Sequence, residues 1–190
     1  MNACRLATSA DAAAIREIYA PIVRDTSISF EYEVPTVAEL ATRVEQVLQT
    51  RPWLVYEEAG EILGYTYATT FRSRTAYDWG PEVSIYVRSD VQKKGLGQLL
   101  YGTLFDVLRA QNYCRVVAGA TVPNESSERL HTRMGFQMIG RYPAAGFKHG
   151  AWHDVLFWYL PLRPLPESAP QLININELIK TAEWRWLIKS

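Results

Sequence analysis

The sequence predicts an α/β (α+β) fold, with one mixed central β-sheet and helices on both faces. A length of 190 residues suits a single domain with a sizeable core. Hydrophobic residues make up 48% of the chain and charged residues 21%, the composition of a folded globular protein. Short apolar runs alternate with longer segments whose apolar residues recur every three or four positions. This order of strands and helices is typical of a sheet that helices cover on both sides.

Local signals place the individual elements. A first helix follows Asp11, and Pro21 is expected to distort it or to end it early. Thr36 and Glu39 have the spacing of a capping box, which predicts that a second helix begins there. One strand is predicted to begin at residue 5 and another at residue 82. Five more are predicted over residues 53–58, 62–71, 114–120, 136–142 and 152–160. A late helix is predicted over residues 124–134.

The helix after residue 95 carries the clearest apolar stripe, at spacings of three and four. The stripe consists of Leu96, Leu99, Leu100, Leu104, Val107 and Leu108.

Residues 1–162 are predicted to form the domain, and residues 163–190 a proline-rich tether and an apolar tail. The tail has helix-like spacing between Ile175 and Trp186. It is either a helix that docks on the domain or on a second subunit, or a poorly ordered extension.

Composition excludes several classes of protein. Twenty acidic residues balance twenty basic ones, so the overall charge does not favour nucleic acid or an anionic membrane as a partner. No apolar run approaches the roughly 20 residues that cross a bilayer, and the N-terminus lacks a secretory signal. The two cysteines and three histidines have no metal-like spacing. A cytoplasmic protein without a metal is expected.

The loop before the striped helix predicts an anion site. A helix N-terminus presents backbone N–H groups and a partial positive charge to an anion. Gly95 and Gly97 leave the main chain open to approach, and Lys93 and Lys94 add two cations. Gln98 follows the last glycine where a P-loop needs Lys, and Leu100 stands where a dinucleotide fingerprint needs a third glycine or alanine, so neither motif matches. A phosphorylated cofactor of another kind is predicted here.

Two sets of motifs resemble known acetyltransferases. Gln92-x-x-Gly95-x-Gly97, together with residues 123–131 and Met134-Gly135-Phe136, resembles the acetyl-CoA loop and late helix of the GCN5-related N-acetyltransferase (GNAT) superfamily. The segments 27–31, 71–79, 82–87 and 146–155 resemble the phosphinothricin and methionine sulfoximine acetyltransferases within it. The resemblance covers residues 4–162 and implies a GNAT fold, with acetyl-CoA as the acetyl donor and no metal.

The resemblance also implies where the cofactor binds. The pantetheine arm is expected beside the strand that begins at residue 82, the pyrophosphate on the basic loop, and further contacts on the late helix. The cofactor-binding residues expected in this way are Ile85, Tyr86, Val87, Lys93, Lys94, Gly95, Leu96, Gly97, Gln98, Asn124 and Ser127. Asn124 also suits a helix cap, and the two roles are compatible.

Acetyl transfer to an amine needs a base that removes a proton from the amine. The resemblance places a catalytic acid at Glu82, and a carboxylate in a partly apolar pocket has a raised pKa that suits a base. The alternative is a strand-capping or ion-paired role. His131 is the second catalytic candidate, although a lone helical histidine is more often a structural hydrogen-bonding group.

Arg72 and Arg74 alternate along a predicted strand, so both are expected on one face, where guanidinium groups suit a carboxylate or phosphinate. Phe30 and Tyr77 are expected to wall the same pocket. With the resemblance, these substrate-binding residues favour a small glutamate-like amino acid such as phosphinothricin or methionine sulfoximine, acetylated directly on its α-amine in a ternary complex. Herbicide resistance is then one outcome of such an activity. Gly80-Pro81 before Glu82 departs from the family pattern.

Two alternatives stay open from the sequence. One is an acetyltransferase for another small amine or for a protein N-terminus. The other is a non-catalytic acyl-CoA sensor, against which the retained Glu82 and His131 count. A homodimer is expected because the family commonly forms dimers and the tail adds apolar surface.

Overall fold

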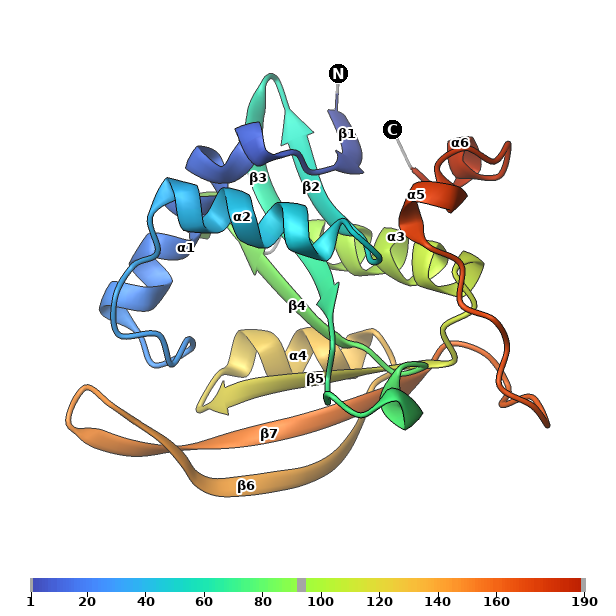
Figure 1. Ribbon diagram of the computed structural model, residues 1–190. Coiled ribbons are helices and arrows are strands. Elements are labelled where there is room, and N and C mark those ends of the chain that lie inside the picture. The colour runs from blue at the N-terminus through green and yellow to red at the C-terminus, as the bar shows by residue number, and fades with distance from the viewer. Residues whose placement is uncertain (1, 92–94, 189–190) are drawn as a thin grey trace.

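A mixed β-sheet forms the centre of the protein (Figure 1). The computed structural model describes residues 2–91 and 95–188. Within these residues the sheet has seven strands in the order β1-β2-β3-β4-β5-β7-β6, and only β4 and β5 pair in parallel. The strands are β1 (Asn2–Leu6), β2 (Trp53–Glu58), β3 (Glu61–Thr69), β4 (Glu82–Val87), β5 (Arg115–Val122), β6 (Gln137–Lys148) and β7 (Ala151–Pro161). The predicted mixed sheet is confirmed.

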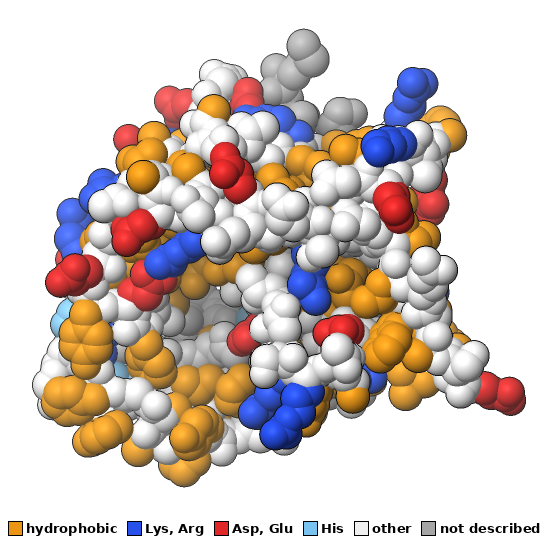
Figure 2. Space-filling model, viewed as in Figure 1, with side chains coloured by type: hydrophobic (Ala, Val, Ile, Leu, Met, Phe, Trp, Pro, Cys, Tyr) orange, Lys and Arg blue, Asp and Glu red, His pale blue; other side chains and the backbone are white. Residues whose placement is uncertain are grey.

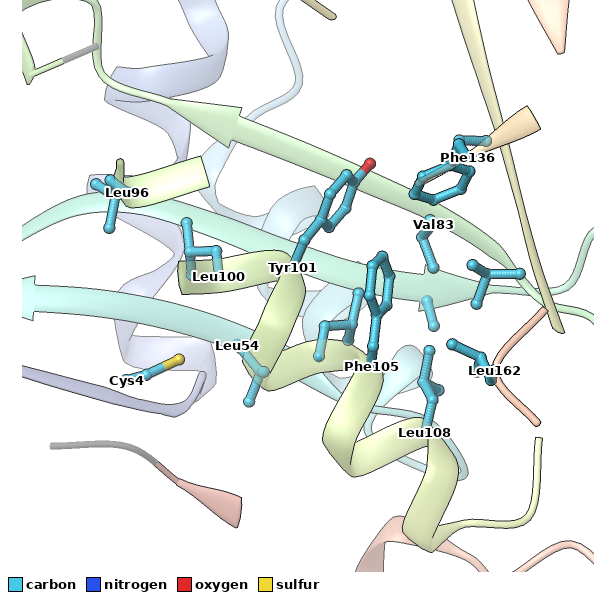
Figure 3. Packing of buried hydrophobic residues seen from close by; sticks show 14 of the residues in the cluster. Cys4, Leu54, Val83, Leu96, Leu100, Tyr101, Phe105, Leu108, Phe136 and Leu162 are labelled. Atoms are coloured by element: carbon cyan, nitrogen blue, oxygen red, sulfur yellow. The ribbon is translucent and has the colours of Figure 1, made fainter. Parts of the chain in front are cut away.

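Helices cover both faces of this sheet, as predicted. Helices α1 (Ala12–Asp25) and α2 (Val37–Val47) pack on one face, and α3 (Leu96–Ala110) and α4 (Glu125–Arg133) on the other. Figure 3 shows how Leu100, Phe105 and Leu108 of α3 reach into the core beside Leu54 of β2. Leu99, predicted on the apolar stripe, is 38% exposed. The short elements are η1 (Ser9–Asp11), η2 (Thr75–Tyr77), η3 (Ser89–Val91), α5 (Ile175–Leu178) and α6 (Trp184–Leu187).

The predicted capping box is present at the start of α2. The Thr36 hydroxyl accepts a hydrogen bond from the Glu39 amide at 3.2 Å, and the Glu39 carboxylate accepts one from the Thr36 amide at 2.7 Å. The expectation that Pro21 ends the helix early is wrong, because α1 continues through it to Asp25. Pro21 is exposed while Ile18 and Val23 on either side of it are buried, so packing on both sides holds the helix together.

Two predicted strand boundaries are corrected. The strand predicted over residues 62–71 ends at Thr69, because its neighbour β4 begins opposite that residue, at Glu82. The strand predicted over residues 136–142 is the longer β6, which continues to Lys148. From sequence alone, Pro143 predicts a break in the strand. A register shift between Tyr142 and Gly146 lets the strand continue past this proline.

The C-terminal tail packs on the domain through two short helices rather than one. Ile175 and Leu178 are each 1% exposed and contact Val107 of α3. The buried side-chain amide of Gln111 donates hydrogen bonds to the Thr50 and Ile173 carbonyls, at 3.0 and 2.8 Å. These contacts join the tail to α3 and to the end of α2. No helix among the described residues is long and apolar enough to cross a membrane.

The docked tail is expected to contribute to stability. Leu178→Ala removes a buried side chain and leaves a cavity, so we expect the free energy of unfolding to fall by about 2–5 kcal/mol. The matched control is Leu165→Ala, at a residue that is 65% exposed. Urea unfolding followed by circular dichroism measures both. Equal stabilities of the two variants would contradict the docking.

Candidate active site

The site is a groove that opens where β4 and β5 diverge. Among the described residues these two strands share a single pair, Glu82 with Val117, and they separate beyond it. The Arg88 amide bonds to the Leu63 carbonyl of β3, so by strand alternation the amide of Ile85 turns away from β3, toward the groove. The groove has a volume of about 760 Å³ and lies between β4, β5 and the facing ends of α3 and α4. Its size and open strand edge suit an extended ligand.

The N-terminus of α3 closes one end of the groove. Gly95 caps the helix with φ +82°, a left-handed conformation that favours glycine. Gly97 has a use beyond the one predicted, since a Cβ there would lie 3.2 Å from Leu130 of α4. Because glycine has no Cβ, α3 and α4 can approach each other at this point. Lys93 and Lys94, the predicted cations, lie outside the described residues.

The remaining predicted cofactor-binding residues all line this groove. They are Ile85, Tyr86, Val87, Gly95, Leu96, Gly97, Gln98, Asn124 and Ser127. On α4, the Asn124 side chain accepts a hydrogen bond from the Ser127 amide at 3.1 Å, so it caps the helix as well as facing the groove. The structure therefore gathers these residues from three separate elements, β4, α3 and α4, around one space.

Glu82 lies beside Gly119, a residue that lines the groove. Its carboxylate oxygen is 3.3 Å from the place that a Cβ on Gly119 would occupy, so the glycine makes room for it. Among the described residues the carboxylate has no hydrogen-bond or ion-pair partner, and burial raises its pKa above the ordinary value near 4.5. A half-buried carboxylate without a cation beside it can accept a proton from a ligand at neutral pH.

His131 lines the groove but is 3% exposed. Its Nδ1 donates a hydrogen bond to the Ser127 carbonyl at 2.8 Å, and its ring stacks on Trp158 with centroids 4.8 Å apart. Burial lowers its pKa below 6.5. Because Nδ1 carries the proton, Nε2 is the acceptor that faces the Tyr101 hydroxyl, at 3.3 Å. The neutral imidazole thus orients a second polar group.

Tyr101 is a candidate that is missing from the predicted site residues. It belongs to α3, is 1% exposed, and lines the groove with its hydroxyl beside His131. Burial raises its pKa, so the hydroxyl keeps its proton. The sequence signal is a tyrosine on the buried stripe of a helix, where the hydroxyl needs a polar partner.

The substrate-binding prediction needs correction at Arg72 and Arg74. They do not alternate along a strand, because β3 ends at Thr69 and residues 70–74 form an exposed connection to η2. The Arg72 guanidinium instead stacks over the Phe71 ring at 5.2 Å. Both arginines are exposed, and their common face is not given by strand geometry.

A row of rings connects this loop to Glu82. Tyr77 meets Phe71 edge-on at 6.3 Å between centroids, and Phe71 meets Phe157 of β7 at 6.4 Å. The Phe157 ring lies 3.1 Å from the Cβ position of Gly119, the same point that the Glu82 carboxylate approaches. Phe71 and Phe157 therefore connect the loop that carries Arg72 to the part of the groove beside Gly119 and Glu82.

Phe30 lies on the opposite side, in the connection between α1 and α2. A Cβ on Gly146 of β6 would be 2.5 Å from its ring, so the two segments are in close contact there. Neighbouring Ile22 and Ile28 line the groove itself. Figure 2 shows a hollow between the half of the molecule that carries α2 and the half formed by β6 and β7. No cluster of three potential metal ligands occurs among residues 2–91 and 95–188.

Comparisons with known proteins agree with this arrangement. The family model described as an acetyltransferase (GNAT) domain matches residues 4–157. The phosphinothricin N-acetyltransferase of Streptomyces viridochromogenes is 40% identical over 166 residues, which cover 85% of this chain and 91% of that protein. The L-methionine sulfoximine/L-methionine sulfone acetyltransferase of Salmonella typhimurium is 37% identical over 159 residues, covering 83% and 93%.

Solved structures show the same fold. The GNAT superfamily phosphinothricin acetyltransferase of Sinorhizobium meliloti, solved in complex with acetyl-CoA, superposes with a TM-score of 0.84 at 34% identity. The match covers 93% of this chain and 97% of that one. The fold predicted from the sequence is thereby confirmed. The chain belongs to the GNAT family and is an acetyltransferase.

Proposed function

We propose that the protein transfers an acetyl group from acetyl-CoA to the α-amine of a small glutamate-like amino acid, by direct transfer in a ternary complex. The observation that supports it most is the groove between β4 and β5, with a half-buried carboxylate, Glu82, next to its lining residue Gly119 and no cation beside that carboxylate among the described residues. Phosphinothricin and methionine sulfoximine are the proposed substrates, since relatives 35–40% identical are named for them.

The groove fits an acyl-CoA in size and in the groups that it offers. The strand edge at Ile85–Val87 would pair with the amide-bearing pantetheine arm, and the N-terminus of α3 at Gly95–Gln98 would hold the pyrophosphate. Asn124 and Ser127 would contact the arm from α4. Lys93 and Lys94 remain proposed cofactor contacts from their sequence positions alone.

The proposed reaction moves two protons. Glu82 takes one from the α-ammonium group of the acceptor, directly or through a water molecule, so that the nitrogen lone pair is free. Bound acetyl-CoA supplies the thioester, in which a C–N bond replaces the C–S bond. The Tyr101 hydroxyl lies in the groove wall, where it would turn its single proton from His131 Nε2 to the departing sulfur. His131 is then a positioning residue, and the second proton leaves the nitrogen as the amide forms and passes to the sulfur as the product leaves.

The acceptor is proposed to lie between the Arg72 loop and the Phe30 loop. Arg72 would bind the carboxylate or phosphinate of the amino acid, with Tyr77 and Phe30 as apolar walls. Arg74, beside the start of η2, is the second proposed anion contact. The Gly80 backbone fits closely under Arg115, since a Cβ there would lie 2.8 Å from its Nε. The departure at Gly80-Pro81 therefore shapes the base of this loop.

We also propose that the protein forms a homodimer through the β6–β7 face. β6 is an edge strand, and unpaired edges with apolar side chains tend to associate. The hairpin carries, over its two faces, the exposed residues Met138, Ile139, Tyr142, Phe147 and Trp152. Apolar side chains gather over this hairpin in Figure 2. A second copy of the chain would cover them.

Replacement of the proposed base tests the reaction. Glu82→Gln keeps the shape of the side chain and removes its basicity, so we expect kcat/KM with phosphinothricin to fall by about 100-fold or more. Coenzyme A binding, followed by calorimetry, is expected to stay within about twofold. Thiol release from acetyl-CoA measures turnover, and Glu177→Gln, at an exposed residue of α5, is the matched control. Unchanged turnover in Glu82→Gln would refute the role of the carboxylate.

The outcome for the wild-type protein also separates the alternatives. Turnover on other amines or on peptide N-termini, but not on glutamate-like amino acids, would replace the proposed substrate. Coenzyme A binding without transfer to any amine would indicate a sensor.

Arg72→Ala tests the substrate contact. Loss of a charge-assisted hydrogen bond to the acceptor is expected to raise the acceptor KM by about tenfold or more, with the acetyl-CoA KM unchanged. Arg185→Ala, at an exposed arginine on α6, is the control. Steady-state kinetics with both substrates varied gives the two constants. Equal acceptor KM values in the two variants would show that Arg72 does not bind the substrate.

The proposed dimer is tested by a charge on its face. Trp152→Arg, at a residue 66% exposed, is expected to convert a dimer into a monomer in light-scattering measurements. Trp186→Arg, on α6 and 84% exposed, changes the same side chain elsewhere and should leave the mass unchanged. A monomeric wild-type protein, or a dimer that only Trp186→Arg disrupts, would contradict the proposed interface.

A further inference from the structure

A lysine is buried where the β6–β7 hairpin meets the connection between α1 and α2. Lys148, the last residue of β6, is 3% exposed and is the one buried side chain with a formal charge among the described residues. Its ammonium group donates hydrogen bonds to the Val23 and Ser29 carbonyls, each at 2.7 Å. A lysine is rarely buried without such partners, because its desolvation is costly.

The two acceptors belong to the two segments that wall the groove on this side. Val23 lies in the last turn of α1, where carbonyls lack helical partners and a cation is favourable. Ser29 lies in the connection that follows. Each acceptor comes directly after a residue that lines the groove, Ile22 and Ile28. One ammonium group therefore sets the positions of both wall segments.

Other contacts join the same segment to the hairpin. Phe30 packs against Gly146, the Tyr32 hydroxyl donates to the Phe147 carbonyl, and the His149 ring donates to the Thr26 carbonyl at 3.2 Å. Unlike Lys148, the side chains of Tyr32 and His149 are exposed, so water can replace their partners. The lysine is the contact whose loss leaves buried carbonyls unpaired.

The segment is also connected to the groove from within. The Ser29 hydroxyl and the Tyr19 hydroxyl are 2.7 Å apart, and the Tyr19 ring meets the Tyr86 ring edge-on at 5.1 Å between centroids. Tyr86 lines the groove. A displacement of residues 26–32 would therefore reach the wall at Ile28 and Phe30 on one side and Tyr86 on the other.

We propose that Lys148 is a positioning residue for the acceptor. Its ammonium group holds residues 26–32 against the hairpin, so that Ile28 and Phe30 form a fixed wall opposite the Arg72 loop. It acts through these residues and does not touch the substrate. The inference rests on the proposed function for the identity of the acceptor, and on the contacts above for the position of the wall.

Lys148→Met tests this role, since methionine has nearly the same length and no donor. The acceptor KM is expected to rise by about tenfold or more, while kcat falls by less than about threefold. Lys148→Arg, which keeps a cationic donor, is expected to restore much of the affinity for the acceptor. Arg141→Met, on the same hairpin but paired with Asp154, is the matched control. If Lys148→Met does not fold, the acceptor KM is compared between Lys148→Gln and Lys148→Arg instead.

A double-mutant cycle with Phe30→Ala separates positioning from general stability. If Lys148 acts through the wall, Lys148→Met raises the acceptor KM by less than about twofold once Phe30 is absent. An acceptor KM of the double variant that is raised by the product of the two single effects would overturn the proposal. So would an unchanged acceptor KM in a folded Lys148→Met protein.

A measurement without substrate tests the positioning role of Lys148 independently of the proposed function. Hydrogen exchange of residues 22–33 is expected to speed up about tenfold in Lys148→Met, with β1–β3 unchanged. Equal exchange in the two proteins would overturn the positioning role, whichever amine is acetylated. Absence of acetyl transfer by the wild-type protein, with faster exchange in the variant, would refute the proposed substrate and leave the positioning of the wall intact.

Discussion

The divergence of β4 and β5 is the constraint on which the rest of the structure depends. Two parallel strands that share only the Glu82–Val117 pair leave an open strand edge in the middle of a sheet. Such an edge is costly in a folded protein unless a ligand or another segment uses it. The glycines around it, Gly97 and Gly119, keep side chains out of the opening, so a groove forms in place of a packed core.

The electrostatics of the groove follow from where the strands separate. Glu82 belongs to the last shared pair, so it is buried enough to raise its pKa and is without a cation among the described residues. On the facing helices burial favours uncharged groups: it lowers the pKa of His131, which is neutral, and raises the pKa of Tyr101, which keeps its proton. The carboxylate beside Gly119 and the Tyr101 hydroxyl in the groove wall are the base and the hydroxyl donor of the transfer that we propose.

The parts of the site that the sequence predicts are those built from local pattern. The capping box at Thr36, the glycines before α3, and the groove-lining residues of β4 and α4 follow from short motifs and from the family resemblance. Strand alternation does not extend to Arg72 and Arg74, because β3 ends at Thr69, opposite the first residue of β4. Tyr101 and Lys148 depend on contacts 30 and 119–125 residues distant in sequence, which no local pattern contains.

The measurement that tests the central claim most directly is the pH dependence of kcat/KM. A base acts only when unprotonated, so the rate constant should fall as pH falls through the pKa of Glu82 in the free protein. Because burial raises that pKa, we expect an acidic limb with its midpoint above 4.5 in the wild-type protein and no such limb in Glu82→Gln. The same acidic limb in both proteins would show that another group removes the proton.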